Sequence, residues 1–275
     1  MKIKKKIFFG SIIFLNLFFY KISYGDIIAK DFSYGLRASN YLYQEFVDDK
    51  QTAFMKLNGQ AYGGDFSLTY NIEDFTDDEV LYKINVALDF SSLDYKGSYQ
   101  SGNYGDLEMG GNSNSVFEIA FLSEANLENS SFFPYIGIAY RKLDNQLVGS
   151  GGYKRVSKYY YIPIGAKLDI YEDADLSANF SVQYNLFLKG EQFSGIGDGL
   201  TNEQNEGYGL RISFDIEHRL DNGDNFIIRP FYQFWEIEDS DAGYYTDSYG
   251  VQKSGLEPYN FTREIGVSFL MKMEL

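Results

Sequence analysis

The sequence predicts an all-β protein, a single transmembrane antiparallel β-barrel of about ten strands, with eight or twelve strands as alternatives. Three observations lead to this fold class. Apolar residues recur at every second position along most of the chain, which is the period of a strand with one apolar face. The alternating segments are long enough to cross a bilayer, which takes about 9–11 residues. The connections between them alternate between long and short.

The first 25 residues have the features of a cleaved signal peptide, so the predicted barrel domain covers 26–275. Four lysines in 2–6 precede the apolar run 7–20, which is shorter than the ~20 residues that a membrane-spanning helix needs. Ser23 to Gly25 then supply the small-x-small pattern that signal peptidase cleaves. An uncleaved N-terminal anchor is the alternative interpretation.

The first half of the barrel domain contains five segments with strand periodicity. They are 31–44, 53–72, 80–91, 115–122 and 133–142. Alternation is clearest over 32–38, 66–72 and 82–90, where apolar residues face one way and Ser, Thr, Asn or Lys face the other. Three glycines interrupt the second strand and the fourth is short, so these two are the weakest predictions.

The second half contains five more such segments. They are 157–170, 175–190, 207–219, 225–236 and 260–274. From Leu176 to Leu188 one face is apolar throughout, and the other is polar apart from Phe187. The last alternation extends to Leu275. A strand in that place can pair with the first strand and close the barrel, so that the sheet has no edge in lipid.

The predicted connections differ in length with a regular parity. Long polar connections follow the odd-numbered strands from the third onward, at 92–114, 143–156, 191–206 and 237–259. Short ones follow even-numbered strands, including an Asn-Gly turn at 222–223. This parity is typical of bacterial outer-membrane barrels, which have short periplasmic turns and long outer loops. We therefore expect four substantial outer loops, whose Tyr, Ser, Gly and Asn suit contacts with an extracellular ligand.

Aromatic residues make up 18% of the chain and occur near the predicted strand ends. Rings with one wet side are suited to the headgroup level of a membrane, where they form two girdles. The expected interfacial residues are Tyr41, Tyr43, Tyr159, Tyr160, Tyr161, Phe234 and Trp235.

Charged residues on the polar faces of the strands would point into the lumen. The candidates for a polar network there are Glu118, Lys167, Arg211, Asp215, Arg229 and Glu264. We expect them to form a paired, hydrogen-bonded core, because an unpaired buried charge is costly. A narrow solute path is the alternative, limited by the small lumen of a ten-stranded barrel.

The composition excludes several kinds of site. The chain has no Cys and one His, which removes disulfides, thiolate chemistry and His-rich metal centres. Its formal net charge is −15, and loss of the signal peptide, with its five lysines, leaves 19 basic against 39 acidic residues. Such a chain offers no broad nucleic-acid surface. We expect no cofactor, no metal and no nucleic-acid partner; the acids at 238–241 are expected to be solvated loop charges.

Five stretches of the chain together carry a family resemblance: Pro134–Arg141, Tyr159–Gly165, Asn205–Arg211, Arg229–Trp235 and Glu257–Pro258. They resemble a group of uncharacterised porin-family, OmpA-like outer-membrane barrels. The resemblance implies a location in the bacterial outer membrane, with lipid, lipopolysaccharide and the barrel assembly machinery as partners. It brings no assigned chemistry. Such chains usually end in Phe, whereas this one ends in Leu275.

The stretch Asp215–Arg219 is similar to omptin-type proteases, which are ten-stranded barrels with Asp and His at the outer rim. Strand alternation places His218 on the face opposite Asp215 and Glu217, beside the turn expected at the periplasmic end. We therefore expect a structural His and no catalysis. The predicted function is a structural or surface-exposed barrel, for adhesion or narrow passive permeability. A rim-located enzyme, either omptin-like or lipid-modifying, and a soluble β-sandwich are the alternatives.

Overall fold

The computed structural model describes residues 27–47, 50, 52–72, 79–98, 103–127, 130–149 and 151–275. The expected signal peptide, 1–25, lies outside these residues. All regular elements in the described part of the chain are strands. No helix there is long and apolar enough to cross a membrane.

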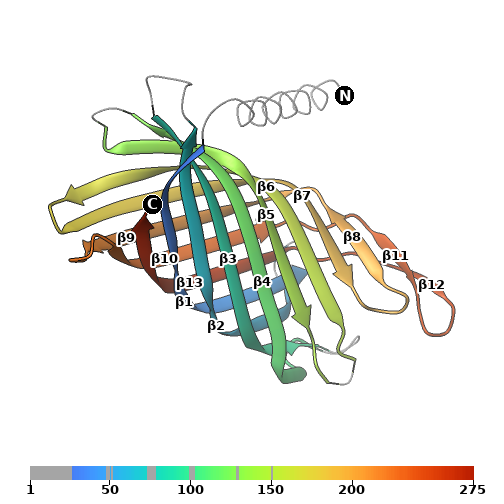
Figure 1. Cartoon of the computed structure of the whole chain (residues 1–275). Coiled ribbons are helices and arrows are strands. Elements are labelled where there is room, and N and C mark those ends of the chain that lie inside the picture. Colours follow the sequence, from blue (N-terminus) through green and yellow to red (C-terminus); the bar gives the residue numbers. More distant parts are fainter. Residues whose placement is uncertain are drawn as a thin grey trace, which may run out of the picture.

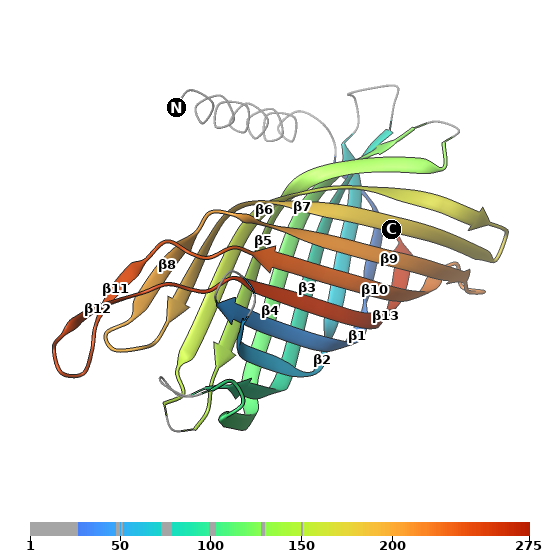
Figure 2. The same ribbon diagram turned by 180° about the vertical axis from the view of Figure 1, so that it is seen from behind.

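Ten long strands form the barrel. They are β1 (Ile27–Val47), β2 (Thr52–Ile72), β3 (Glu79–Gly97), β4 (Leu107–Asn126), β5 (Phe132–Gln146), β6 (Lys154–Glu172), β7 (Leu176–Ser194), β9 (Gly207–Arg219), β10 (Asn225–Ile237) and β13 (Asn260–Glu274). Three short strands, β8 (Leu200–Gln204), β11 (Gly243–Thr246) and β12 (Gln252–Gly255), lie at one end. Figures 1 and 2 show the barrel from two sides.

The sheet is closed and antiparallel, as the sequence predicts. β1 pairs with β13 from Asp31↔Glu274 to Glu45↔Asn260, and β6 pairs with β7 on the other side. Closure gives the backbone N–H and C=O groups of every long strand a neighbour on both sides, which is what a sheet in hydrocarbon requires. The predicted fold class and the prediction of ten strands are both confirmed.

Gly63, on the inner wall of β2, allows close approach where the sequence pattern looked broken. Gly63 lies between Arg37 and Asp89 in the register of β1, β2 and β3. A Cβ at Gly63 would lie 1.7 Å from the Leu88 carbonyl oxygen. The missing side chain leaves room for Arg37 to reach Asp89 across β2. Glycine therefore interrupts the apolar pattern of the second strand without interrupting the strand.

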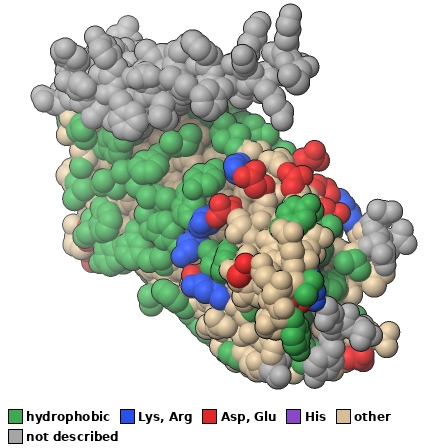
Figure 3. Space-filling view, turned by 90° about the vertical axis from the view of Figure 1, so that its right-hand side faces the viewer, with side chains coloured by type: hydrophobic (Ala, Val, Ile, Leu, Met, Phe, Trp, Pro, Cys, Tyr) green, Lys and Arg blue, Asp and Glu red, His purple; other side chains and the backbone are tan. Residues whose placement is uncertain are grey.

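The outer wall is apolar over a broad band. Leu36, Phe90 and Ile265 expose 74%, 62% and 59% of their surface. They belong to an apolar belt, which also contains Phe66, Phe121, Ile138, Ile164, Val182, Leu186, Ile212 and Phe269. Figure 3 shows apolar side chains covering much of one side of the wall, with charged side chains beside them. A band of this kind is the surface that a spanning barrel presents to lipid.

The strands continue beyond the apolar belt, into segments that the sequence assigned to loops. β3 extends to Gly97 and β4 begins at Leu107, so strand covers much of 92–114. β8 lies within 191–206, and the β11–β12 hairpin lies within 237–259. The boundary is marked on the outside by ion pairs of Lys158 with Glu191 and of Lys189 with Glu203. Beyond the belt the outer face of a strand meets water instead of lipid and no longer has to be apolar, so the apolar alternation disappears while backbone pairing continues.

Candidate functional site

The interior of the barrel contains most of the aromatic residues expected at the membrane interface, and this corrects the prediction. Tyr41, Tyr43, Tyr159, Tyr161 and Trp235 are each 5% exposed or less. The Trp235 ring lies 4.8 Å from that of Tyr161 and 6.0 Å from that of Tyr159, centroid to centroid. We call Tyr41, Tyr159, Tyr161, Phe187 and Trp235 the aromatic layer. These rings face inward because successive side chains of a strand point to opposite faces; of the run 159–161, only Tyr160 points outward.

An outer row of aromatic rings does exist, and Tyr160 and Phe234 belong to it. On one side of the wall, Tyr140 lies 5.1 Å from Tyr160 and 6.4 Å from Phe117. On the other side of the wall, the ring of Phe234 lies about 6 Å from those of Tyr208 and Phe261. The members that sequence reasoning missed are Phe46, Phe117, Tyr140, Tyr184, Tyr208 and Phe261. They share the parity of the apolar belt, which is the signal that could have found them.

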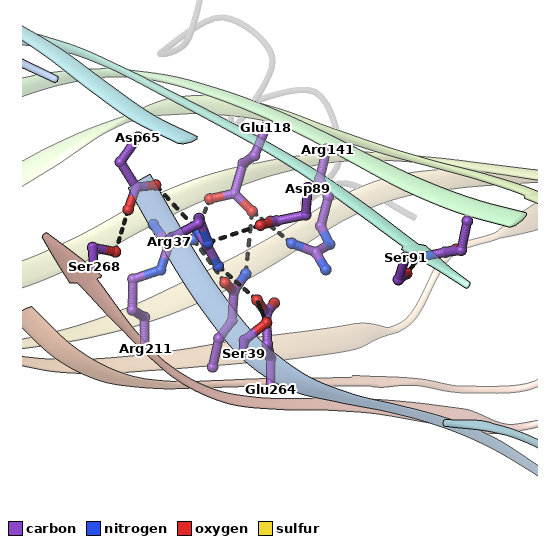
Figure 4. Close-up of polar contacts among 12 residues, drawn as sticks. Arg37, Ser39, Asp65, Asp89, Ser91, Glu118, Arg141, Arg211, Glu264 and Ser268 are labelled. Carbon is purple, nitrogen blue, oxygen red and sulfur yellow. Dashed lines mark hydrogen bonds and ion pairs between the residues drawn. The ribbon is translucent and has the colours of Figure 1, made fainter. Parts of the chain in front are cut away.

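Below the aromatic layer, Arg37 on β1 is surrounded by three carboxylates. Its guanidinium lies 3.0 Å from Asp65, 3.0 Å from Asp89 and 2.7 Å from Glu264. Ser39 donates a further hydrogen bond of 2.8 Å to Glu264. Figure 4 shows these side chains converging inside the barrel. The contacts connect four neighbouring strands, β13, β1, β2 and β3, along one wall of the barrel.

Glu118 on β4 forms the second half of this cluster. Arg141 lies 2.9 Å from its carboxylate, Arg211 contacts the other oxygen, and Gln233 donates to it at 3.1 Å. We call Arg37, Asp65, Asp89, Glu118, Arg141, Arg211, Gln233 and Glu264 the central network. Three of the predicted lumen residues, Glu118, Arg211 and Glu264, belong to it. Asp89, on the polar face of the predicted strand 80–91, was also expected inside. Arg37, Asp65 and Arg141 were missed, although they share the inward parity of the predicted residues.

The other three predicted lumen residues lie nearer the end with the short turns. Arg229 makes a bidentate ion pair with Asp215, through Nε at 2.7 Å and Nη2 at 2.6 Å. Lys167 lies 3.5 Å from Asp169, and its ammonium sits 4.4 Å from the Phe133 ring centroid. A polar cavity of about 310 Å³ occupies this part of the lumen, lined by Lys167, Arg211, Asp215 and Arg229 among others. The structure thus distributes the predicted set over two levels.

A second buried cluster lies beyond the apolar belt, at the end with the long hairpins. We call Tyr43, Glu45, Arg155 and Glu257 the rim cluster. Arg155 contacts both carboxylates, and the Tyr43 hydroxyl oxygen, which has one proton to donate, lies 2.8 Å from Glu45 Oε1 and 3.0 Å from Glu257 Oε1. Burial raises the pKa of Glu257 to about 8; Arg155 opposes the rise and Glu45 adds to it. Glu257 precedes β13, so the cluster ties the connection from the β11–β12 hairpin to β1 and β6.

His218 is exposed and lies at the opposite end from the rim cluster. Its Nδ1 is 3.0 Å from the Asp175 carbonyl oxygen, in the turn between β6 and β7. It is the only His in the sequence, so the end with the long hairpins has none. Among the described residues, no group of three His, Asp or Glu is placed to hold a metal ion.

Comparison with known proteins gives a fold and no family. No protein-family model and no curated protein matches the sequence. The fold is similar to the outer membrane protease OmpT from Escherichia coli, with a TM-score of 0.60 and 9% identity, over 92% of this chain and 98% of that chain. The transport unit of the autotransporter AIDA-I from Escherichia coli gives a TM-score of 0.39 at 11% identity, over 86% and 89%. The translocator domain of the autotransporter NalP from Neisseria meningitidis gives 0.36 at 8%, over 87% and 88%.

The likeness to OmpT, at 9% identity, supports the barrel fold alone. The porin-family resemblance stays an expectation, because no family model matches. The protease activity of OmpT likewise does not transfer at 9% identity.

Proposed function

We propose that this chain is a bacterial outer-membrane barrel with a closed lumen, which displays its long hairpins outside the cell for contact with an extracellular ligand. The apolar belt supports the membrane location. The turns at 173–175 and 220–224 are short, and the connections at the opposite end are long hairpins. In barrels of the outer membrane, short turns face the periplasm and long connections face outward.

One observation supports the proposal of a closed lumen: packed side chains fill the middle of the barrel. Trp235 and Tyr161 in the aromatic layer are 1% exposed. Gln233 and Glu264 in the central network, directly beneath, are 2% exposed. A solute would have to displace both a ring stack and a set of buried ion pairs, and such pairs are costly to break.

The β11–β12 hairpin presents exposed aromatic side chains on a hydrogen-bonded support. The β11–β12 hairpin exposes 68% of Tyr244, 89% of Tyr249 and 53% of Val251. It is held to β8, since Asn202 donates 2.9 Å hydrogen bonds to the carbonyl oxygens of Asp241 and Gly255. Exposed Tyr on a fixed support offers contact area at low entropic cost, as binding loops do. These features favour recognition or adhesion.

We infer that the barrel is not an enzyme. The end that carries the long hairpins has no His, and the rim cluster locks its Arg, Tyr and carboxylates onto one another. The rim therefore has no His–carboxylate pair for general-base chemistry.

Single-cysteine labelling tests the orientation, because the chain has no native Cys. Tyr249→Cys should react with a membrane-impermeant maleimide on intact cells. The matched variant Asn222→Cys, at the opposite end, should react only after the outer membrane is opened. Labelling of Asn222→Cys alone on intact cells would reverse the proposed orientation.

Planar-bilayer recording tests the closed lumen. Refolded protein, whose folding is checked by heat-modifiable migration in detergent gels, should leave the bilayer silent. Discrete conductance steps from the folded form would refute closure and would favour the narrow-permeability alternative.

A further inference from the structure

The polar cavity at the short-turn end concentrates positive charge in an acidic protein. Its volume is about 310 Å³, at the lower end of the range for small-molecule pockets. Six of the 19 basic residues outside the signal peptide line it: Arg37, Lys83, Lys167, Arg211, Arg229 and Lys272. Five acidic residues line it too, although acids outnumber bases two to one in the barrel domain.

Most of the carboxylates in the cavity wall already have cations of their own. Glu124 forms an ion pair with Lys83 at 2.7 Å, and Glu217 forms one with Lys272. Asp215 takes Arg229 through both of its oxygens. These pairs fix the lysine and arginine side chains in place, and their acids do not compete for further donors.

Two arginines keep donors for the cavity. In the described part of the chain, Arg229 uses Nε and Nη2 on Asp215, which leaves Nη1 for another acceptor. Arg211 uses Nη2 on Glu118 and Gln233, which leaves Nε and Nη1. Arg211 shares the Glu118 carboxylate with Arg141, so that one acid is divided between two guanidiniums. The Arg211 and Arg229 side chains are 25% and 32% exposed although both point into the barrel.

We propose that this cavity binds a small, water-soluble oxyanion, a carboxylate- or phosphate-bearing solute that enters from the short-turn end. The planar guanidinium of Arg211, with two donors still available, matches the geometry of such groups. Arg229 supplies a third donor, and Ser33, Ser67 and Ser213 line the same cavity with hydroxyl groups. The central network closes the far side, so the cavity is a dead end and not a path.

Isothermal titration of the folded, detergent-solubilised barrel tests the proposal, with citrate and inorganic phosphate as probes at constant ionic strength. We expect saturable binding of at least one probe. Arg211→Gln should weaken it about tenfold, the effect of losing one charge-assisted hydrogen bond. This variant keeps Glu118 paired with Arg141. Arg211→Lys keeps the charge but loses the planar set of donors, so its affinity for the probe should lie between those of the unmodified protein and of Arg211→Gln.

The paired variant Arg229→Gln with Asp215→Asn removes a cation and its acid together, and keeps the test available if Arg211→Gln does not fold. It should also weaken binding. The matched control, Lys158→Gln with Glu191→Gln, removes an equivalent pair from the outer wall and should leave binding unchanged. Absence of binding by both probes, or an equal loss in the control, overturns the proposal. Neither result bears on the closed lumen or on the hairpins, which have their own tests.

Discussion

Replacing Arg37 with methionine should strongly destabilise the barrel. The substitution keeps much of the aliphatic volume and removes the only cation within ion-pair distance of Asp65, Asp89 and Glu264 in the described residues. Asp89 and Glu264 are 5% exposed or less, so water cannot replace the guanidinium there.

The magnitude follows from this burial. Removing one partner of a buried ion pair costs about 3–5 kcal/mol, because the other charge stays buried without compensation. Loss of the Arg37 guanidinium above the Phe231 ring, 4.4 Å from its centroid, adds about 1 kcal/mol. Asp65, at 18% exposure, borders the polar cavity and recovers part of its hydration. We therefore expect a loss of about 4 kcal/mol, not three times the cost of one pair.

The assay is urea unfolding in lipid vesicles, followed by tryptophan fluorescence. Trp235 is the only Trp and is 1% exposed, so its emission reports directly on the barrel interior. Adding Glu264→Gln to Arg37→Met should recover part of the loss, since one stranded carboxylate is neutralised.

The control is Lys158→Gln, which breaks a 2.7 Å ion pair between side chains about 40% exposed. Exposed pairs contribute about 0–1 kcal/mol. A loss below about 1 kcal/mol for Arg37→Met, or no difference from this control, would refute the view that the central network holds the strands together.

Three further predictions concern other parts of the barrel. Burial holds the folded-state pKa of Glu257 at about 8, above its ordinary 4.5, so the stability that this group contributes is lost as pH rises between these values. Glu257→Gln should flatten that decline in urea midpoints measured from pH 5 to 9. An unchanged slope would contradict the raised pKa of Glu257. Gly63→Ala should prevent folding, because the new Cβ would lie 1.7 Å from the Leu88 carbonyl oxygen; heat-modifiable migration should be lost, but kept in Gly110→Ala, where the nearest atom is a side-chain oxygen at 3.2 Å. His218→Ala should change unfolding stability by no more than about 0.5 kcal/mol, because the ring is exposed; a larger loss would mean that the ring holds the β6–β7 turn in place.

The strand number and the closed topology follow from the sequence because one face of each strand must be apolar where it meets lipid. The segment Leu176–Leu188 shows this period directly, and it lies within β7. Strand ends could not be placed in the same way. Beyond the belt, residues such as Asn112 and Asn114 of β4 pair as strand, although no apolar alternation marks them.

The interior was predicted less well, for two reasons. The aromatic assignment used distance from strand ends, whereas parity decides whether a ring such as that of Tyr159 or Tyr160 faces in or out. Pairing inside the lumen depends on contacts between strands that are not neighbours in the sheet, as Arg211 of β9 with Glu118 of β4 shows. One sequence holds no information on such cross-strand register.

The turn at the tip of the β11–β12 hairpin is built by its own residues. The Asp247 carboxylate accepts backbone hydrogen bonds from Tyr249 at 2.9 Å and Val251 at 3.0 Å, and Gly250 adopts a φ of 78°. Lys253 lies 2.9 Å from the same carboxylate, whereas Tyr249 and Val251 contribute only backbone N–H groups to this arrangement. In the proposed orientation, with this hairpin outside the cell, antibodies or bacteriophages would drive sequence divergence at Ser248 and Tyr249, while Asp247 and Gly250 preserve the shape that presents them.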